Sequence, residues 1–147
     1  MRRLPAISAH RNARMGPFVG HSRHQTSLGS YSTEVGRHVT CCLLVETSEA
    51  VENIESILRV PGIDLVVVAQ FDLSGALGLE GQFESPVFIE AVDKIERAAA
   101  QSGLPLGAAA LSRDQSSSLI AKGYSALFHG FDVLMLKEQI AQFATWD

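Results

Sequence analysis

The 147-residue sequence lacks several features that would each define a class of protein. It has no uninterrupted apolar run near the roughly 18 residues that a membrane-spanning helix needs. It contains no G-x-S-x-G elbow, no Walker loop and no C-x-x-C pair, which argues against a serine hydrolase, a P-loop nucleotidase and a zinc ribbon. With 46% hydrophobic and 19% charged residues, the composition predicts a soluble globular protein with no membrane partner.

Cysteine is scarce as well. The chain has two, Cys41 and Cys42, and they are adjacent within an apolar run. Neighbouring side chains of a strand point to opposite faces, so these thiols cannot easily bridge each other. We expect both to be small buried hydrophobes in a protein of a reducing compartment, and we predict a cytoplasmic location.

Acidic residues are nearly missing from the first quarter of the chain. Residues 1–37 contain six arginines, no aspartate and a single acid, Glu34, whereas residues 38–147 hold six basic and fifteen acidic residues. An Arg-rich, Ser-containing start is typical of a mitochondrial transit peptide, which would change the predicted compartment. The alternative is a basic, loop-rich lead-in. No basic run interleaves with aromatic residues, so we predict no nucleic-acid partner.

From residue 38 onward, apolar runs of strand length alternate with segments of helical periodicity. The pattern predicts strands at 39–45, 63–69, 105–110 and 126–129, helices at 48–58, 86–101, 114–122 and 132–144, and a glycine-rich loop at 75–81. Such alternation indicates an α/β fold with a parallel sheet and right-handed crossovers. Four β/α units fit either an open doubly wound sheet or half of an eight-stranded barrel.

Three carboxylates follow predicted strands, where parallel β/α proteins place their functional groups. Glu46 and Asp72 leave two neighbouring strands at the same edge, so they could share one hard divalent cation, with water and substrate oxygens as further ligands. Alternatively, Asp72 caps a turn through Ser74, and Glu46 is a solvated residue in the first turn of a helix. The third carboxylate, Asp132, fits a helix N-cap better than a ligand.

Several short motifs follow one another in a fixed order. They are Val45-Glu46-Thr47, Ala50-Val51-Glu52-Asn53-Ile54, Pro61-Gly62-Ile63-Asp64, Phe71-Asp72-Leu73-Ser74 with Leu77-Gly78, and Gly130-Phe131-Asp132. In order and spacing the sequence resembles the HpcH/HpaI aldolase and citrate lyase family over residues 39–144. The resemblance implies about the C-terminal half of a TIM barrel of the phosphoenolpyruvate/pyruvate type. Residues 38–147 would then form a partial barrel, and residues 1–37 a lead-in or a truncated barrel remnant.

The resemblance also implies a function, that of a metal-dependent lyase of the 2-oxo-acid aldolase branch. Glu46 and Asp72 would bind Mg²⁺ or Mn²⁺, and backbone amides around Phe71 and Asp72 would hold the substrate carboxylate. The ion would stabilise an enolate while a 4-hydroxy-2-oxo acid is cleaved to pyruvate and an aldehyde. The acid/base pair and the substrate-binding arginine belong to the first half of the family's barrel. Because residues 1–37 offer no counterpart, we assign no catalytic residue.

The sequence departs from the family pattern beside the predicted site. Aldolase relatives read Gly-Pro-x-Asp-Leu-Ser, whereas this chain has Ala69-Gln70 in place of Gly-Pro, and Leu44 replaces a glutamine. Two other functions therefore stay open: a non-catalytic fragment or subunit-interaction module, and a citrate-lyase-like enzyme that acts on a coenzyme A thioester. Because half a barrel exposes strand edges and apolar helix faces, we expect a homo-oligomer or a complementing chain.

Overall fold

The computed structural model describes residues 39–144, and every structural statement below concerns that part of the chain. Its centre is a parallel sheet with the strand order β1-β2-β3-β4. The strands are β1 (Cys42–Val45), β2 (Leu65–Val68), β3 (Leu106–Ala110) and β4 (Ala126–His129). A doubly wound sheet reverses its strand order at a switch point, whereas each strand here lies beside the next one in the sequence. This order is that of consecutive barrel units.

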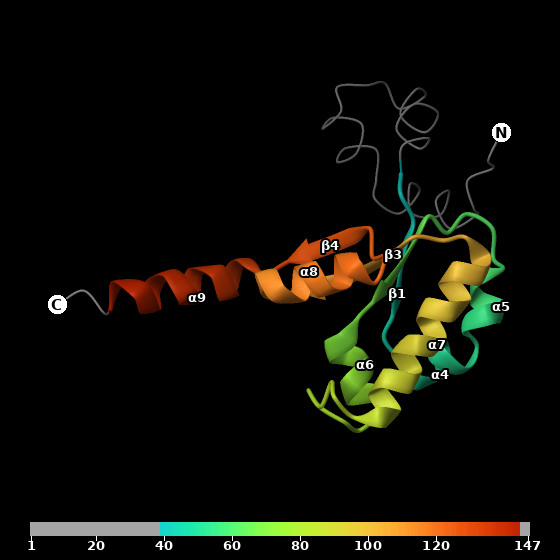
Figure 1. Ribbon diagram of the computed structural model, residues 1–147, viewed down its shortest axis with the longest axis horizontal. Coiled ribbons are helices and arrows are strands. Elements are labelled where there is room, and N and C mark those ends of the chain that lie inside the picture. Colours follow the sequence, from blue (N-terminus) through green and yellow to red (C-terminus); the bar gives the residue numbers. More distant parts are fainter. Residues whose placement is uncertain (1–38, 145–147) are drawn as a thin grey trace, which may run out of the picture.

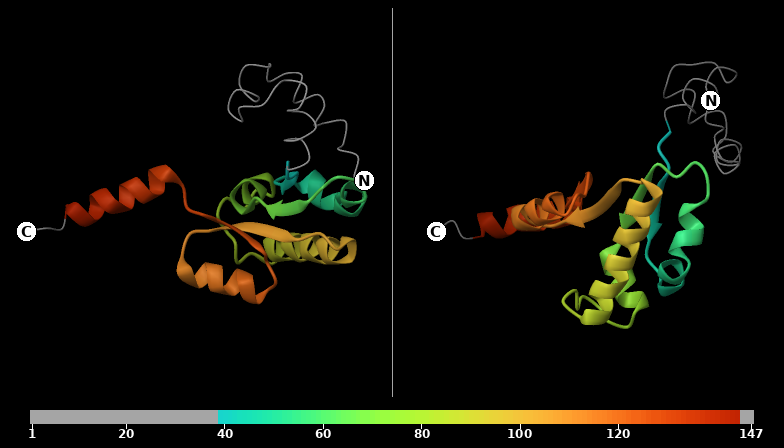
Figure 2. Two further views of the ribbon diagram at one scale, coloured as in Figure 1. Left: turned by 90° about the horizontal axis from the view of Figure 1, so that it is seen from above. Right: turned by 45° about the vertical axis from the view of Figure 1, so that its right-hand side comes forward.

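Helices connect and follow the strands (Figure 1). They are α4 (Ser48–Glu52), α5 (Ile54–Leu58), α6 (Gln70–Ala76), α7 (Pro86–Ser102), α8 (Arg113–Ala121) and α9 (Asp132–Phe143). Helix α7 packs on β2 and against α4 and α5, so these helices form a layer over the sheet. Helix α9 extends away from that layer (Figures 1 and 2). No helix of residues 39–144 is long and apolar enough to cross a membrane.

The hydrophobic core lies between the sheet and the layer of α4, α5 and α7. Val66 of β2, Ile54 of α5 and Ile95 of α7 are completely buried. Strand β2 is buried along its whole length, as its uninterrupted apolar sequence predicts. Small side chains at Ala99 and Ala108 belong to the same core and allow α7 to lie close to the sheet. This packing holds the carboxyl ends of β1 and β2 side by side.

Helix α7 confirms the prediction for residues 86–101 to within one residue at its end. Pro86 begins the helix, where a missing N–H group costs no hydrogen bond. Gly103 follows the last turn with a φ of 65°, a left-handed conformation that glycine adopts without steric cost. The backbone N–H of Leu104 donates to the carbonyl of Ala99 at 3.0 Å and completes the cap.

The single helix predicted for residues 48–58 is wrong, because two short helices, α4 and α5, meet at Asn53. Asn53 has φ −98° and ψ 10°, outside the regular helical range. Its side-chain Nδ2 donates to the carbonyl of Glu49 at 2.9 Å, and Ser56 Oγ donates to the carbonyl of Asn53 at 2.8 Å. The carbonyls of Glu49 and Asn53 also accept from the backbone N–H groups of Asn53 and Ile57, so these side-chain bonds share acceptors with the backbone at the point where the two helices meet.

The glycine-rich loop predicted for residues 75–81 begins later than expected. Helix α6 starts directly after β2 and includes Gly75 and Ala76. Only Leu73 and Ser74 of this helix are buried, so its apolar face is too short to show a helical period in the sequence. Asp72 therefore lies in a helix and not in an open loop.

Strand β1 is less buried than its apolar sequence predicts. Leu44 is 53% exposed and Cys42 is exposed, whereas Val45 is buried. The strand lies at the edge of the described sheet, and only one of its faces meets the helical layer. The prediction of two buried thiols is therefore wrong: Cys41 is half-buried, Cys42 is exposed, and both are free.

Candidate metal and substrate site

Glu46 and Asp72 lie at the same edge of the sheet, as the strand pattern predicts. Glu46 follows the last residue of β1, Val45, whose carbonyl accepts a hydrogen bond from the N–H of Ala69 at 3.1 Å. Ala69 is the N-cap of α6, and Asp72 belongs to the first turn of that helix. Both carboxylate side chains are exposed. Their roles as metal ligands remain predictions.

The alternative interpretation made Glu46 a solvated residue in a first helical turn and Asp72 the cap of a turn through Ser74. Glu46 is exposed, but the structure differs in its position and in the group that closes the turn. Glu46 precedes Thr47, which is the N-cap of α4 and accepts a hydrogen bond from the N–H of Ala50 at 3.1 Å. Glu46 is therefore outside the helix. The turn after Asp72 is closed by the hydroxyl of Ser74, which donates to the carbonyl of Phe71 at 2.7 Å.

Ser74 has a role that the sequence analysis missed. The residue is 1% exposed, and its Oγ also accepts a hydrogen bond from the N–H of Gly81 at 3.0 Å. The backbone N–H of Leu79 donates to the carbonyl of Ser74 at 2.8 Å. No spacing rule identifies these contacts, because they depend on how residues 77–85 fold back over α6.

Phe71, one of the predicted substrate-binding residues, is 41% exposed. Its ring lies edge-on to the ring of Phe83, with centroids 5.3 Å apart, and Phe83 makes the same kind of contact with Phe88 at 5.3 Å. Phe88 is buried, so this aromatic series connects the site to the core. The backbone amides of Phe71 and Asp72 lie in the first helical turn, where N–H groups have no partner within the helix. Their contact with a substrate remains a prediction.

The donor set fits a metal that needs few protein ligands. Within residues 39–144, no cluster of three or more His, Cys, Asp or Glu side chains could hold a metal ion. A closed structural zinc site needs four such ligands. In contrast, Mg²⁺ is bound by one or two carboxylates and keeps waters or substrate oxygens in its other positions. Glu46 and Asp72 together offer that minimal set of oxygen donors.

Asp132, the third carboxylate at a strand end, forms a hydrogen bond within its own helix, α9. Its Oδ1 accepts a hydrogen bond from the N–H of Val133 at 2.8 Å. The N-cap of α9 is Phe131, so the prediction of Asp132 as N-cap is wrong by one position. Asp132 is the first helical residue, where a carboxylate favours the positive end of the helix dipole.

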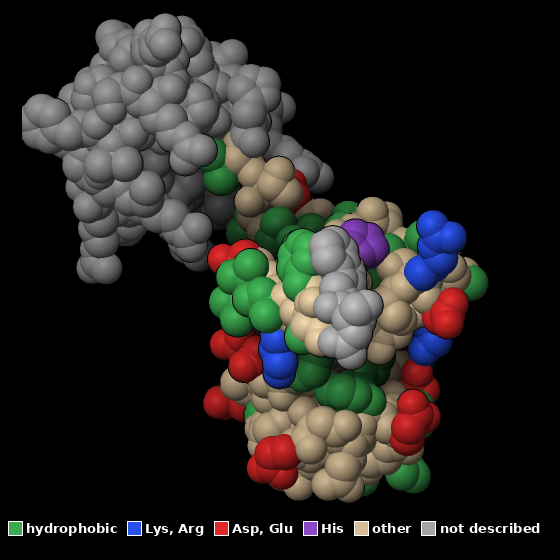
Figure 3. All heavy atoms as spheres, turned by 90° about the vertical axis from the view of Figure 1, so that its left-hand side faces the viewer, with side chains coloured by type: hydrophobic (Ala, Val, Ile, Leu, Met, Phe, Trp, Pro, Cys, Tyr) green, Lys and Arg blue, Asp and Glu red, His purple; other side chains and the backbone are tan. Residues whose placement is uncertain are grey.

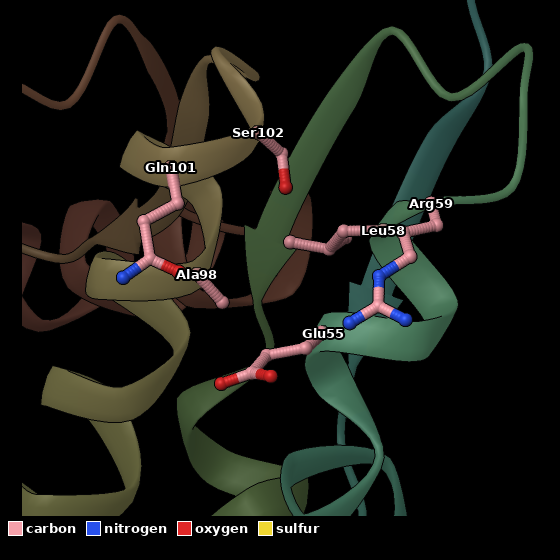
Figure 4. Close-up of a pocket in the computed structure, with 6 residues that line it drawn as sticks. All are labelled: Glu55, Leu58, Arg59, Ala98, Gln101 and Ser102. Atoms are coloured by element: carbon pink, nitrogen blue, oxygen red, sulfur yellow. The ribbon is translucent and has the colours of Figure 1, made fainter.

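A separate hollow of about 380 Å³ lies between α5 and α7 (Figure 4). Its lining residues are Glu55, Leu58, Arg59, Ala98, Gln101 and Ser102. Both helices end here and lead into the amino ends of β2 and β3. The hollow is therefore at the end of the sheet opposite Glu46 and Asp72, the end that in barrels serves stability.

The described elements thus form a run of parallel β/α units with two carboxylates at the carboxyl-terminal edge of the sheet. The sequence model of the HpcH/HpaI aldolase/citrate lyase family matches residues 10–138. The chain belongs to this family. The matched range begins within the basic segment 1–37, ahead of the part that the structure describes.

Curated relatives carry aldolase names. A 4-hydroxy-4-methyl-2-oxoglutarate aldolase, cghB of Chaetomium globosum, is 35% identical over 95 residues, which cover 59% of this chain and 35% of that protein. The 2-dehydro-3,6-dideoxy-6-sulfogluconate aldolase of Pseudomonas putida is 28% identical over 130 residues, which cover 88% of this chain and 47% of that protein. The chain thus spans less than half the length of these relatives.

Solved structures give the same family and fold. The HpcH/HpaI aldolase from Desulfitobacterium hafniense DCB-2 superposes with a TM-score of 0.70 at 29% identity, covering 81% of this chain and 46% of that one. Macrophomate synthase superposes with a TM-score of 0.65 at 30% identity, covering 80% and 42%. The predicted fold class is confirmed: the chain forms part of an α/β barrel.

Proposed function

We propose that this chain is the metal-binding part of a lyase that cleaves a 4-hydroxy-2-oxo acid to pyruvate and an aldehyde. The observation that carries the proposal is the position of Glu46 and Asp72 at the carboxyl ends of two adjacent parallel strands. The aldolase names of the curated relatives support the reaction class. The small 2-oxo acid is then the substrate partner. The location that we propose is the cytoplasm, a reducing compartment in which cysteines stay free.

In this proposal, Glu46 and Asp72 hold a Mg²⁺ or Mn²⁺ ion through carboxylate oxygens. The bound ion supplies Lewis-acid stabilisation of the negative charge that develops on the keto oxygen of the substrate. The amides of Phe71 and Asp72 donate to the substrate carboxylate and orient it. The bond between C3 and C4 breaks, the C4 hydroxyl loses its proton to become the aldehyde, and C3 gains a proton to give pyruvate. The group that moves these protons is expected in the first half of the barrel.

The test is pyruvate release by the purified full chain from a 4-hydroxy-2-oxo acid, followed with and without Mn²⁺. We expect slow release, because the proton-transferring group is expected in the first half of the barrel. This release should require the metal and fall by at least about 10²-fold in Asp72→Asn and in Glu46→Gln, because each variant removes a charged ligand. Glu49→Gln is the matched control, since Glu49 is an exposed glutamate in the first turn of α4. This control should keep full activity.

The same assay distinguishes the other two functions. Cleavage of a coenzyme A thioester in preference to the free acid would indicate a citrate-lyase-like enzyme. Metal binding without turnover in any oligomeric state would reject the lyase proposal and favour a non-catalytic module that retains the fold. Release that survives removal of both carboxylates would contradict their assignment as ligands.

A further inference from the structure

The peptide groups that precede the two carboxylate residues are both held by hydrogen bonds, but by different means. The carbonyl of Val45, which belongs to the peptide group leading into Glu46, accepts from the N–H of Ala69 at 3.1 Å. This is a bond between neighbouring strand ends. The carbonyl of Phe71 belongs to the peptide group leading into Asp72, and it accepts from Ser74 Oγ at 2.7 Å. The second peptide group lies in the first turn of α6, and the Ser74 side chain adds a hydrogen bond to its carbonyl.

The hydroxyl of Ser74 is held in turn by the loop that follows α6. The N–H of Gly81 donates to Ser74 Oγ at 3.0 Å, so the hydroxyl accepts one hydrogen bond while it donates another. Gly81 has a φ of 75°, a left-handed conformation that glycine adopts without the steric cost that other residues have. Because Ser74 is 1% exposed, water cannot replace either bond freely.

The ring of Phe71 adds a second restraint on the same residue. Phe83, from the loop after α6, lies edge-on to Phe71 at 5.3 Å and to the buried Phe88 at 5.3 Å. Phe71 is thus held through its carbonyl by Ser74 of α6 and through its ring by Phe83 of the loop that follows. Asp72 is the next residue along the chain and is exposed, so its backbone directly follows this anchored peptide group.

We propose that Ser74 is a positioning residue for Asp72: its buried hydroxyl joins the Phe71 carbonyl to the Gly81 amide and so fixes the direction of the Asp72 carboxylate. The inference rests on the proposed function, in which Asp72 is a metal ligand. Groups that orient a ligand without touching the metal commonly change metal affinity by about 10- to 100-fold when they are removed.

The experiment is a titration of the full chain with Mn²⁺ alone, followed by calorimetry at 25 °C, with folding of each variant checked by circular dichroism. We expect Ser74→Ala to bind Mn²⁺ about tenfold more weakly than the wild type. Ser56→Ala is the matched control, because Ser56 Oγ also donates to a carbonyl three residues earlier, at 2.8 Å, and Ser56 is an exposed residue of α5. We expect it to bind Mn²⁺ as the wild type does.

A loss of stability alone must be separated from a loss of positioning. Ile95→Val shortens a fully buried side chain of α7 and should lower the melting temperature without changing Mn²⁺ affinity. If Ser74→Ala does not fold, Ser74→Cys keeps the side-chain shape, replaces the hydroxyl by a larger and weaker donor, and carries the same expectation. Titrating the wild type and the Asp72→Asn variant with Mn²⁺ in parallel tests the metal site itself.

The outcomes are distinguishable. Three results together support the inference. The wild type binds Mn²⁺, Asp72→Asn does not bind it, and Ser74→Ala binds it more weakly than Ile95→Val does. Binding by Ser74→Ala that equals the wild type, while Asp72→Asn has lost it, overturns the role of Ser74 and leaves the proposed function standing. A wild type that does not bind Mn²⁺, or an Asp72→Asn that binds it unchanged, overturns both.

Discussion

Tyr124 is the buried polar residue whose environment the structure defines most closely. It is 5% exposed, and its hydroxyl donates to Glu96 Oε1 at 2.7 Å. The Glu96 carboxylate also lies 3.8 Å from Lys122 Nζ. Tyr124→Phe should lower the free energy of unfolding by about 1.5 kcal/mol, because Glu96 loses a charge-assisted hydrogen bond. Urea denaturation at pH 7 measures the change, and a variant as stable as the wild type would contradict it.

The same residue predicts a pH dependence of stability. Burial, together with the neighbouring Glu96 carboxylate, raises the pKa of Tyr124 well above its usual value of 10. Below pH 10 both the folded and the unfolded chain keep this proton, so stability does not depend on it. Above pH 10 the unfolded chain releases the proton while the folded chain retains it, and the free energy of unfolding falls.

Comparison with Tyr124→Phe isolates this effect from other groups that titrate at alkaline pH. The phenylalanine variant has no phenol to titrate at this position, so the stability advantage of the wild type should shrink between pH 10 and 11. Urea denaturation of both proteins at half-unit pH steps gives the difference directly. A difference that stays constant from pH 8 to pH 11 would show that the pKa of Tyr124 is not raised.

At the scale of elements, the end of α7 and the interior of α6 offer a matched pair of glycine substitutions. Gly103 has a φ of 65° and Gly75 lies within α6 with no positive φ, yet a Cβ atom at either position would meet nothing within 4 Å. Gly103→Ala should therefore destabilise the chain by about 1 kcal/mol through backbone strain alone. Gly75→Ala should stabilise it by up to about 1 kcal/mol, since alanine is the better helix former. Thermal unfolding of both variants tests the opposite signs.

The elements differ in how far the sequence determines them. Strand β2 and helix α7 follow from sequence because one is apolar throughout and the other has a long apolar face between Pro86 and Gly103. The break at Asn53 and the start of α6 do not, because local side-chain hydrogen bonds at Asn53 and a single buried apolar side chain in α6, Leu73, leave no periodic pattern in the sequence. The order of the strands predicts that Glu46 and Asp72 lie at the same edge of the sheet. The hydrogen bonds of Ser74 to Phe71 and Gly81 could not be predicted, because they depend on the path of the loop after α6.

At the scale of the whole molecule, α9 exposes a stripe of apolar side chains. Val133, Leu136 and Ile140 are 72%, 63% and 59% exposed, and they recur at helical spacing along one side of a helix with no buried residue. Figure 3, which views the molecule from the side toward which α9 extends, shows hydrophobic side chains at the surface among charged ones. Apolar patches of this kind mark interaction sites, and we expect a second copy of the chain to cover this one.

Replacing the centre of the stripe should separate the copies. We expect the wild-type chain to sediment as an oligomer at micromolar concentration, and Leu136→Lys combined with Ile140→Lys to shift it toward the monomer. The free energy of unfolding of the monomer should change by less than about 0.5 kcal/mol, because neither side chain is buried. Glu138→Lys changes the net charge by the same two units on the other side of α9 and should leave the oligomer intact. A wild type that is monomeric throughout would contradict self-association and favour a complementing chain as the partner.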